Sequence, residues 1–168
     1  MSKISTDDYF DLVMDSFPGV TPVEFADMTV MSESKFKVQW FNQVYFTSYI
    51  AYADYIDAAL LLSYMNKCQS LQRKGLLRMI ETRVCNSVVI CDRTYQDAID
   101  IALMRPRYNM STDTFPVIVD LKKGAIYYYN GPMATRLLYN RYEREYIDEH
   151  FGRPLRDLSK KYLPNKPK

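Results

Sequence analysis

The residues whose types and spacing could do chemistry lie near the end of an apolar run in the last third of the chain. Residues 117–119 are apolar, Asp120-Leu121-Lys122 follows them, and the segment continues through a glycine turn into three consecutive tyrosines. A carboxylate two residues from a lysine at the end of a strand can hold a divalent cation and position a water molecule. The competing interpretation is that Asp120 and Lys122 are solvated residues of a turn. Such residues are common in turns and need no catalytic role to explain them.

The Asp120-x-Lys122 spacing resembles the acid-x-lysine strand of the PD-(D/E)xK nucleases. The resemblance implies a metal-dependent nuclease, with Asp120 on the metal, Lys122 at the attacking water and a second carboxylate from Asp113 or Asp92. In that family the strand usually leads toward a helix, whereas this strand leads straight into a turn. We therefore favour the turn interpretation and expect neither Asp120 nor Lys122 to be catalytic.

Other acidic residues stand where metal ligands can gather, at the end of a predicted strand and the start of the next helix. They are Asp92, Asp97 and Asp100. Helix capping and the favourable interaction of acids with a helix N-terminus explain these positions more simply. The sequence leaves open whether these three cluster in space with Asp113 and Asp120.

His150 is the only histidine, which excludes a zinc site made of several histidines from one chain. Its place near the predicted end of a helix favours a structural role, since a histidine there interacts well with the helix dipole. The chain has only five glycines and no glycine-rich phosphate loop. We expect no cofactor and no metal, and an enzyme is less favoured than a binding protein.

A second set of short motifs brackets the tyrosines. Phe115-Pro116-Val117 precedes a predicted hairpin, and Tyr129-Asn130-Gly131-Pro132 opens a predicted helix. Together they resemble the C-terminal half of thioredoxin-like domains, with residues 88–104 as the preceding strand and helix. The connection from Asp92 to Pro116 is longer than is usual in that family, and the catalytic Cys-x-x-Cys is missing. The resemblance implies a thioredoxin-like fold without redox activity.

Fifteen tyrosines among 168 residues form the main compositional signal. Tyr127 and Tyr129 point to one face of the predicted hairpin and Tyr128 to the other, so both faces carry aromatic rings. Tyr142 and Tyr146 continue the pattern along the following helix. Tyrosine offers a large contact area with little rotamer entropy, and it is enriched at protein interfaces. We expect these five tyrosines to contribute to a protein interface.

The C-terminal segment is basic. Residues 136–168 carry nine Lys or Arg against five Asp or Glu, whereas the whole chain has a net charge of +2. Four cations of this segment are included in the expected interface: Arg153, Arg156, Lys160 and Lys161. Tyrosine beside arginine also suits single-stranded nucleic acid, and this leaves nucleic-acid binding as the alternative function.

The predicted fold is a compact α+β domain over residues 1–163, with a basic, proline-containing tail at 164–168. We expect a helix-rich N-terminal two-thirds and a small sheet that includes a C-terminal β-hairpin at about 115–130, followed by a helix. Helices are predicted from Thr6 to about residue 17, from Pro22, over residues 47–72, and from Thr94 to Met104. Residues 88–91 form a short apolar run that predicts a buried strand.

The chain shows no export signal and no apolar run long enough to cross a membrane. Its cysteines, Cys68, Cys85 and Cys91, form no Cys-x-x-Cys pair, and an odd number suits a reducing compartment. We expect an intracellular or virion protein, not a secreted one. The expected function is a non-enzymatic protein interaction or a structural role in a larger homo- or hetero-oligomeric assembly, for which a viral particle would be suitable.

Overall fold

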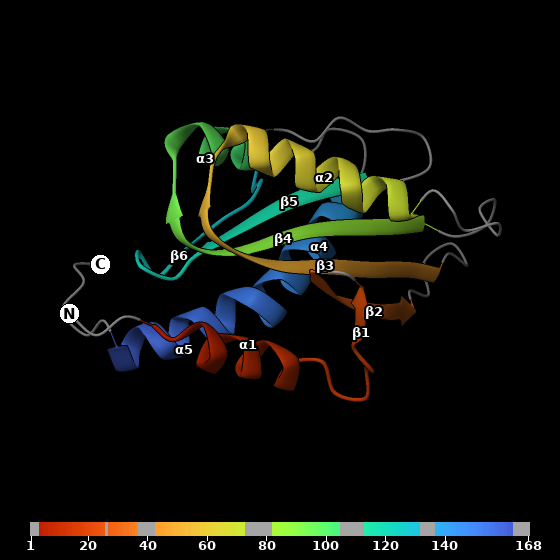
Figure 1. Cartoon of the computed structure of the whole chain (residues 1–168). Helices are drawn as coiled ribbons and strands as arrows, with labels where there is room; N and C mark the ends of the chain where they lie inside the picture. Colours follow the sequence, from red (N-terminus) through yellow and green to blue (C-terminus); the bar gives the residue numbers. More distant parts are fainter. Residues whose placement is uncertain are drawn as a thin grey trace.

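The computed structural model describes residues 4–25, 27–36, 43–72, 82–104, 113–131 and 137–162. Its strands form one six-stranded mixed sheet in the order β1-β2-β3-β4-β5-β6. Helices cover both faces of this sheet (Figure 1). None of the helices in the described residues combines the length and the apolar character needed to cross a membrane.

The first half of the sheet is antiparallel. β1 (Val23–Phe25) pairs with β2 (Met28–Phe36), and β2 pairs with the long strand β3 (Gln43–Ile56). Aromatic and β-branched residues are frequent in β3, and they favour the extended conformation. Along β3 the side chains alternate: Phe46 and Ile50 enter the core on one face, and Tyr49 enters the core on the other.

The second half of the sheet is built by two parallel crossovers. β3, β4 (Thr82–Thr94) and β5 (Asp113–Asp120) are parallel neighbours, with α2 (Ala58–Gln72) after β3 and α3 (Gln96–Leu103) after β4. Parallel strands need such a connection because a tight turn can join only antiparallel ones. The backbone N–H of Leu60 donates to Asp57 Oδ1 at 2.9 Å, so Asp57 caps the start of α2. Both helices lie on the same face of the sheet (Figure 1).

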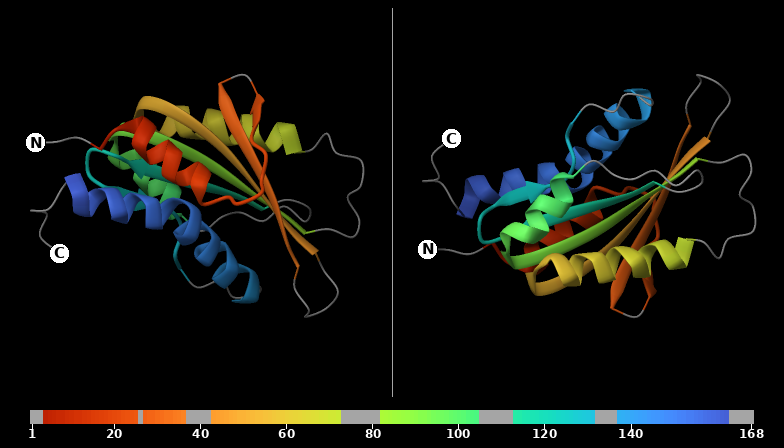
Figure 2. Two further views of the ribbon diagram at one scale, coloured as in Figure 1. Left: turned by 90° about the horizontal axis from the view of Figure 1, so that it is seen from below. Right: turned by 90° about the horizontal axis from the view of Figure 1, so that it is seen from above.

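The remaining helices cover the opposite face. β6 (Ala125–Tyr127) pairs antiparallel with the end of β5, and the chain later forms α4 (Leu137–Ile147), a π-helical turn (Asp148–Gly152) and α5 (Arg153–Tyr162). The N-terminal helix α1 (Thr6–Asp15) lies beside α5 (Figure 2). The Tyr9 hydroxyl donates to the Phe151 carbonyl at 2.9 Å and joins α1 to the π-helical turn.

The hydrophobic core has a layer on each side of the sheet. The larger layer lies between the sheet and α1, the π-helical turn and α5, and it includes Phe17, Val88 and Phe151. The other layer lies under α2 and α3, where Leu61 and Ala98 pack against Val89. Because β4 and β5 are covered on both faces, their sequences read as nearly continuous apolar runs instead of alternating ones.

The predicted fold class is wrong in its arrangement. The N-terminal two-thirds is not dominated by helices, since β1, β2, β3 and β4 all lie within it. The sheet is also not a small one built on a C-terminal hairpin. β5 is an internal strand that runs parallel to β4, and only the three residues of β6 pair antiparallel with its end.

Two predicted helices contain strands. The segment from Pro22 forms β1, although its threonine, proline and glutamate match a helix start. The predicted helix over residues 47–72 contains most of β3, and α2 begins only at Ala58. The first helix is confirmed, and the predicted strand at 88–91 lies inside the longer β4. The helix predicted from Thr94 to Met104 corresponds to α3, and the last helix, predicted from about Leu155 to Tyr162, corresponds to α5, which begins at Arg153. The tail at 164–168 lies outside the described residues.

Candidate functional site

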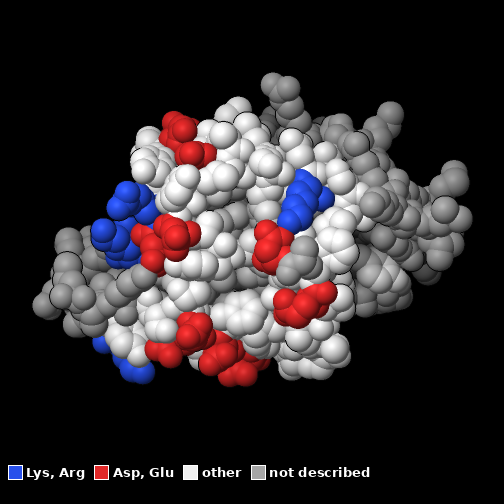
Figure 3. Space-filling view, in the orientation of Figure 1, with Lys and Arg blue, Asp and Glu red and all other residues white. Residues whose placement is uncertain are grey.

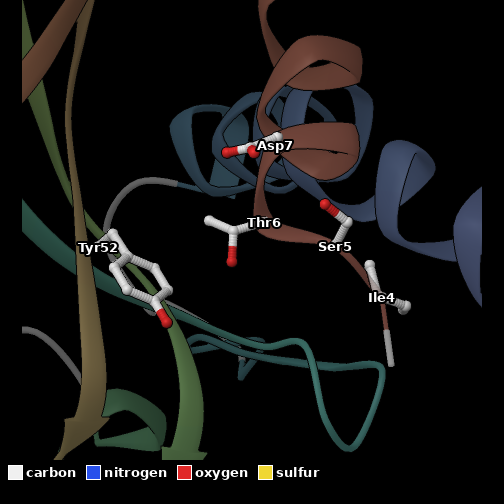
Figure 4. A pocket seen from close by; sticks show the side chains of 5 residues that line it. All are labelled: Ile4, Ser5, Thr6, Asp7 and Tyr52. Atoms are coloured by element: carbon white, nitrogen blue, oxygen red, sulfur yellow. The ribbon is translucent and has the colours of Figure 1, made fainter. Parts of the chain in front are cut away.

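The carboxyl ends of β3, β4 and β5 meet at one edge of the sheet, and the N-terminus of α1 lies at the same end of the molecule (Figure 1). Ligand sites of sheets with parallel strands form at this end, where loops and helix N-termini converge. An open pocket of about 590 Å³ lies here, lined by residues 4–7 and by Tyr52 of β3. Figure 4 shows the Tyr52 ring across the pocket from Thr6, in the first turn of α1.

Tyr52 is held in place although its side chain is 47% exposed. Its hydroxyl donates to Asp92 Oδ2 at 3.2 Å and reaches Asp54 Oδ1 at 3.4 Å. Asp92 ends the apolar part of β4 and Asp54 lies near the end of β3, so the carboxylates come from neighbouring strands. The predicted strand-end acid Asp92 therefore orients a tyrosine ring at the pocket.

Three more apolar side chains are exposed at the same edge. The rings of Tyr55 and Tyr95 meet edge to face, with centroids 6.0 Å apart and planes at 89°. The backbone N–H of Tyr95 donates to the Ile56 carbonyl at 3.0 Å, which fixes the start of α3 beside the end of β3. Leu60 lies in the first turn of α2, four residues after Ile56. We call Tyr52, Tyr55, Leu60 and Tyr95 the carboxyl-end surface.

The tyrosines predicted to form an interface lie elsewhere and are less accessible. Tyr127 is half-buried against the core layer under α2 and α3. Tyr128, Tyr129 and Tyr142 are half-buried against the opposite layer. Tyr146 is 1% exposed, and its ring stacks on Phe46 with centroids 4.5 Å apart. Tyr146 therefore packs in the core, and the carboxyl-end surface does not include it.

The predicted cations lie on the outer face of α5. Arg153, Arg156, Lys160 and Lys161 are all exposed. Arg156 forms a two-point ion pair with Asp148, in which Nη2 lies 2.9 Å from Oδ2. This pair holds the pKa of Asp148 below its usual range.

The acid-x-lysine motif does not form a metal site within the described residues. Asp120 is fully buried, which corrects the expectation that it is solvated. Its Oδ1 accepts from the Lys123 backbone N–H at 2.8 Å and its Oδ2 lies 3.5 Å from Lys123 Nζ, so it closes the turn after β5. Lys122 is exposed.

The helix acids also have local partners. Asp97 Oδ1 accepts from the Ala98 backbone N–H at 2.8 Å, and Asp100 Oδ1 accepts from Gln96 at 2.8 Å. The Asp113 side chain lies outside the described part of the structure. Across the described ranges, no three His, Cys, Asp or Glu side chains lie close enough together to hold a metal ion.

A polar network between α1, β2 and the π-helical turn was missed by sequence reasoning. His150 is 2% exposed, with Nδ1 3.0 Å from Ser16 Oγ and Nε2 3.3 Å from Glu33 Oε2. The order serine, histidine, glutamate is that of a nucleophile system. However, Ser16 Oγ donates its proton to the Val13 carbonyl at 2.6 Å, so the hydroxyl accepts from the imidazole. The network therefore ties the end of α1 to the π-helical turn and does not activate Ser16.

Further polar groups are buried between the sheet and α4. Ser48 Oγ lies 2.9 Å from the Tyr146 hydroxyl, and Asn86 is the register partner of Ser48 on β4. Asn86 is fully buried, and neither of its side-chain polar atoms has a partner in the described structure. Glu143 of α4 is 3% exposed. Asn86 and Ser87, which interrupt the apolar run of β4, were the sequence signal for buried polar groups.

The three cysteines are buried thiols. Burial raises the pKa of Cys91 from its usual range to about 11, and it raises the pKa of Cys68 and Cys85 as well. A thiol that keeps its proton at neutral pH is a poor nucleophile. These residues therefore serve as packing groups.

The class of the protein is defined by its own sheet and helices. The chain is an α+β protein built on one mixed sheet, with helices on both faces and exposed aromatic side chains at the carboxyl ends of its parallel strands. No family model, no curated protein and no solved structure matches it.

Proposed function

We propose that the protein acts by binding another protein through the carboxyl-end surface, as a non-enzymatic component of a larger assembly. The observation that carries this proposal is the exposure of four large side chains at one edge of the sheet. Tyr52 and Tyr55 are each 47% exposed, Tyr95 is 45% exposed and Leu60 is 42% exposed. Large exposed side chains at one end of a sheet are typical of a protein contact.

The surface is ordered before a partner arrives, and this supports a binding role. The Tyr55 and Tyr95 rings pack on each other, and the Tyr52 hydroxyl is held by Asp92. Rings that are already positioned lose little conformational entropy on binding. The adjacent pocket of about 590 Å³ offers a place for an anchoring side chain of the partner.

The test compares two variants, each of which replaces two exposed large side chains with serine. One variant carries Tyr55→Ser and Tyr95→Ser in the carboxyl-end surface. The matched control carries Val23→Ser and Phe25→Ser in β1, where the side chains are 59% and 48% exposed. β1 is the edge strand of the sheet next to β2, and it lies away from the carboxyl ends of β4 and β5 (Figure 1).

Each protein is used to isolate partners from cells, and every candidate is then purified and titrated. We expect one partner to bind the wild type and the β1 control equally. It should bind the tyrosine variant about 5- to 150-fold more weakly, which corresponds to a loss of ~1–3 kcal/mol. Equal affinity for all three proteins, or no purified partner that binds the wild type, would remove the support for this function.

The cations of α5 favour nucleic acid as a second candidate. If α5 neutralised phosphates, each contact would add about 0.7 to 0.9 to the salt slope of binding. The four carboxylates on the neighbouring helix α1 repel phosphates, and this makes the candidate weaker. Titrations of single- and double-stranded oligonucleotides at two salt concentrations, with wild type and with Arg153→Glu/Lys160→Glu, separate the two functions.

A further inference from the structure

The outer face of α1 is acidic and the outer face of α5 is basic. Every charged residue of α1 is an exposed aspartate, and these form the acidic stripe: Asp7, Asp8, Asp11 and Asp15. The exposed charges of α5 form the basic stripe, in which four cations accompany one aspartate: Arg153, Arg156, Asp157, Lys160 and Lys161. The spacing of three and four residues places each set along one side of its helix.

The two stripes lie next to each other on one face of the molecule. Figure 2 shows α1 and α5 side by side, and Figure 3 shows carboxylates gathered along the lower edge, where α1 lies in Figure 1. The helices run in opposite directions. The Tyr162 hydroxyl at the end of α5 donates to Asp8 Oδ2 at the start of α1, at 2.8 Å.

Pairing within the chain uses only part of these charges. Arg156 pairs with Asp148, and Lys160 Nζ lies 3.3 Å from Asp157. In the described part of the chain, Asp11, Asp15 and Arg153 take part in no ion pair. The face therefore presents an acidic half and a basic half to the solvent.

We propose that this face binds a second copy of the same chain. In the dimer, the faces of the two copies meet, and the twofold axis lies in the plane of contact, parallel to α1 and α5 and midway between them. Rotation about this axis brings the acidic stripe of each copy over the basic stripe of the other. The contact is isologous and closes on itself as a dimer. A twofold axis perpendicular to the helices would instead place acidic stripe on acidic stripe, which is repulsive, so the charge pattern selects one of the two arrangements.

The dimer is held by charge and is small. None of the large apolar side chains that are exposed in the described structure belongs to α1 or α5. Each helix has ten residues and is about 15 Å long, so the two helices side by side cover roughly 300 Å² per copy. This is less than the roughly 800 Å² per partner of a standard interface, and the dimer is therefore weak. Interactions between exposed charges weaken as salt shortens the screening length from about 30 Å at 0.01 M to about 3 Å at 1 M. The dimer should therefore form at low salt and dissociate at high salt.

The experiment reverses one stripe at a time in the full chain. Asp11→Lys/Asp15→Lys reverses the acidic stripe, and Arg153→Glu/Lys161→Glu reverses the basic stripe. Sedimentation velocity over a series of protein concentrations gives the fraction of dimer for the wild type, each variant and their equimolar mixture. We expect a wild-type dimer at low salt that is lost at 1 M salt, loss of the dimer in each variant alone, and its recovery in the mixture.

Lys122→Glu is the charge control, because this exposed lysine belongs to neither stripe and should leave the dimer unchanged. Circular dichroism checks that each variant is folded. If a variant does not fold, the wild type is tested instead by carbodiimide cross-linking, which joins carboxylates to lysines. A mixture of ¹⁴N and ¹⁵N wild-type protein distinguishes links between two copies from links within one. Cross-links between copies should then join α1 aspartates to Lys160 or Lys161.

A wild type that is monomeric at every concentration in low salt would overturn the proposal, as would variants that dimerise as well as the wild type. Cross-links that join the copies only through other surfaces would also overturn it. Because these measurements use the purified protein alone, their failure leaves the partner binding of the carboxyl-end surface untouched.

Discussion

Tyr9→Phe tests how α1 is attached to the C-terminal helices. The Tyr9 side chain and Phe151 are both fully buried, and the hydroxyl donates to the Phe151 carbonyl across 142 residues of sequence. Burial raises the pKa of Tyr9 above its usual range, so the hydroxyl remains a donor in ordinary buffers. Phenylalanine keeps the ring and leaves no cavity, and the change removes only the hydrogen bond. We expect a loss of about 1–2 kcal/mol in the free energy of unfolding.

Urea unfolding followed by circular dichroism measures this loss. With a slope near 2 kcal/mol/M, the midpoint should fall by roughly 0.5–1 M while the slope stays constant. Tyr55→Phe is the matched control, because the Tyr55 side chain is 47% exposed and its change should stay within about 0.5 kcal/mol. Equal midpoints for Tyr9→Phe and the control would refute the view that this bond ties α1 to the π-helical turn.

Asp120→Ala should lower the free energy of unfolding by about 1–3 kcal/mol in the same assay, because the buried carboxylate accepts a hydrogen bond from the Lys123 backbone N–H. A change below about 0.5 kcal/mol would contradict this role. Gly152→Ala should lower the melting temperature and raise the pKa of Asp148, as measured by NMR titration. The reason is that an added Cβ would lie 2.7 Å from Asp148 Oδ1 and disturb the ion pair with Arg156. An unchanged pKa of Asp148 would count against this contact. Cys91 should resist iodoacetamide at pH 9 in the folded protein and react in urea. Because the folded pKa of Cys91 is raised to about 11, the free energy of unfolding should fall as the pH rises from 9 to 11, and a flat profile there would contradict its burial.

Part of the fold could be predicted because its signals are local. The capped start of α1, the apolar run inside β4 and the amphipathic pattern of α5 each depend on residues close together in the chain. The prediction of a single helix over residues 47–72 was wrong because the absence of proline and glycine along the whole segment gave no sign of a break. Its first part is rich in tyrosine and other strand-forming residues, and only its second part has the composition of a helix.

The candidate site could not be predicted because its members come from separate elements. Tyr52, Tyr55, Leu60 and Tyr95 lie on β3, on α2 and at the start of α3, and the parallel crossovers bring them to one edge. Conversely, three consecutive tyrosines stand out in the sequence, but pairing with β5 and packing against both core layers leave them half-buried.

Sequence alone determined the supply of aromatic and charged side chains and the helical spacing that lines up the acids of α1 and the cations of α5. Only the tertiary structure decided which of these groups reach the solvent and which stand next to each other. Exposure depends on the layer of helices that covers each face of the sheet, and that layer is set by contacts between residues far apart in the chain. For this reason Tyr146 became a core residue, Asp120 became a buried turn cap, and the two charged helices became neighbours.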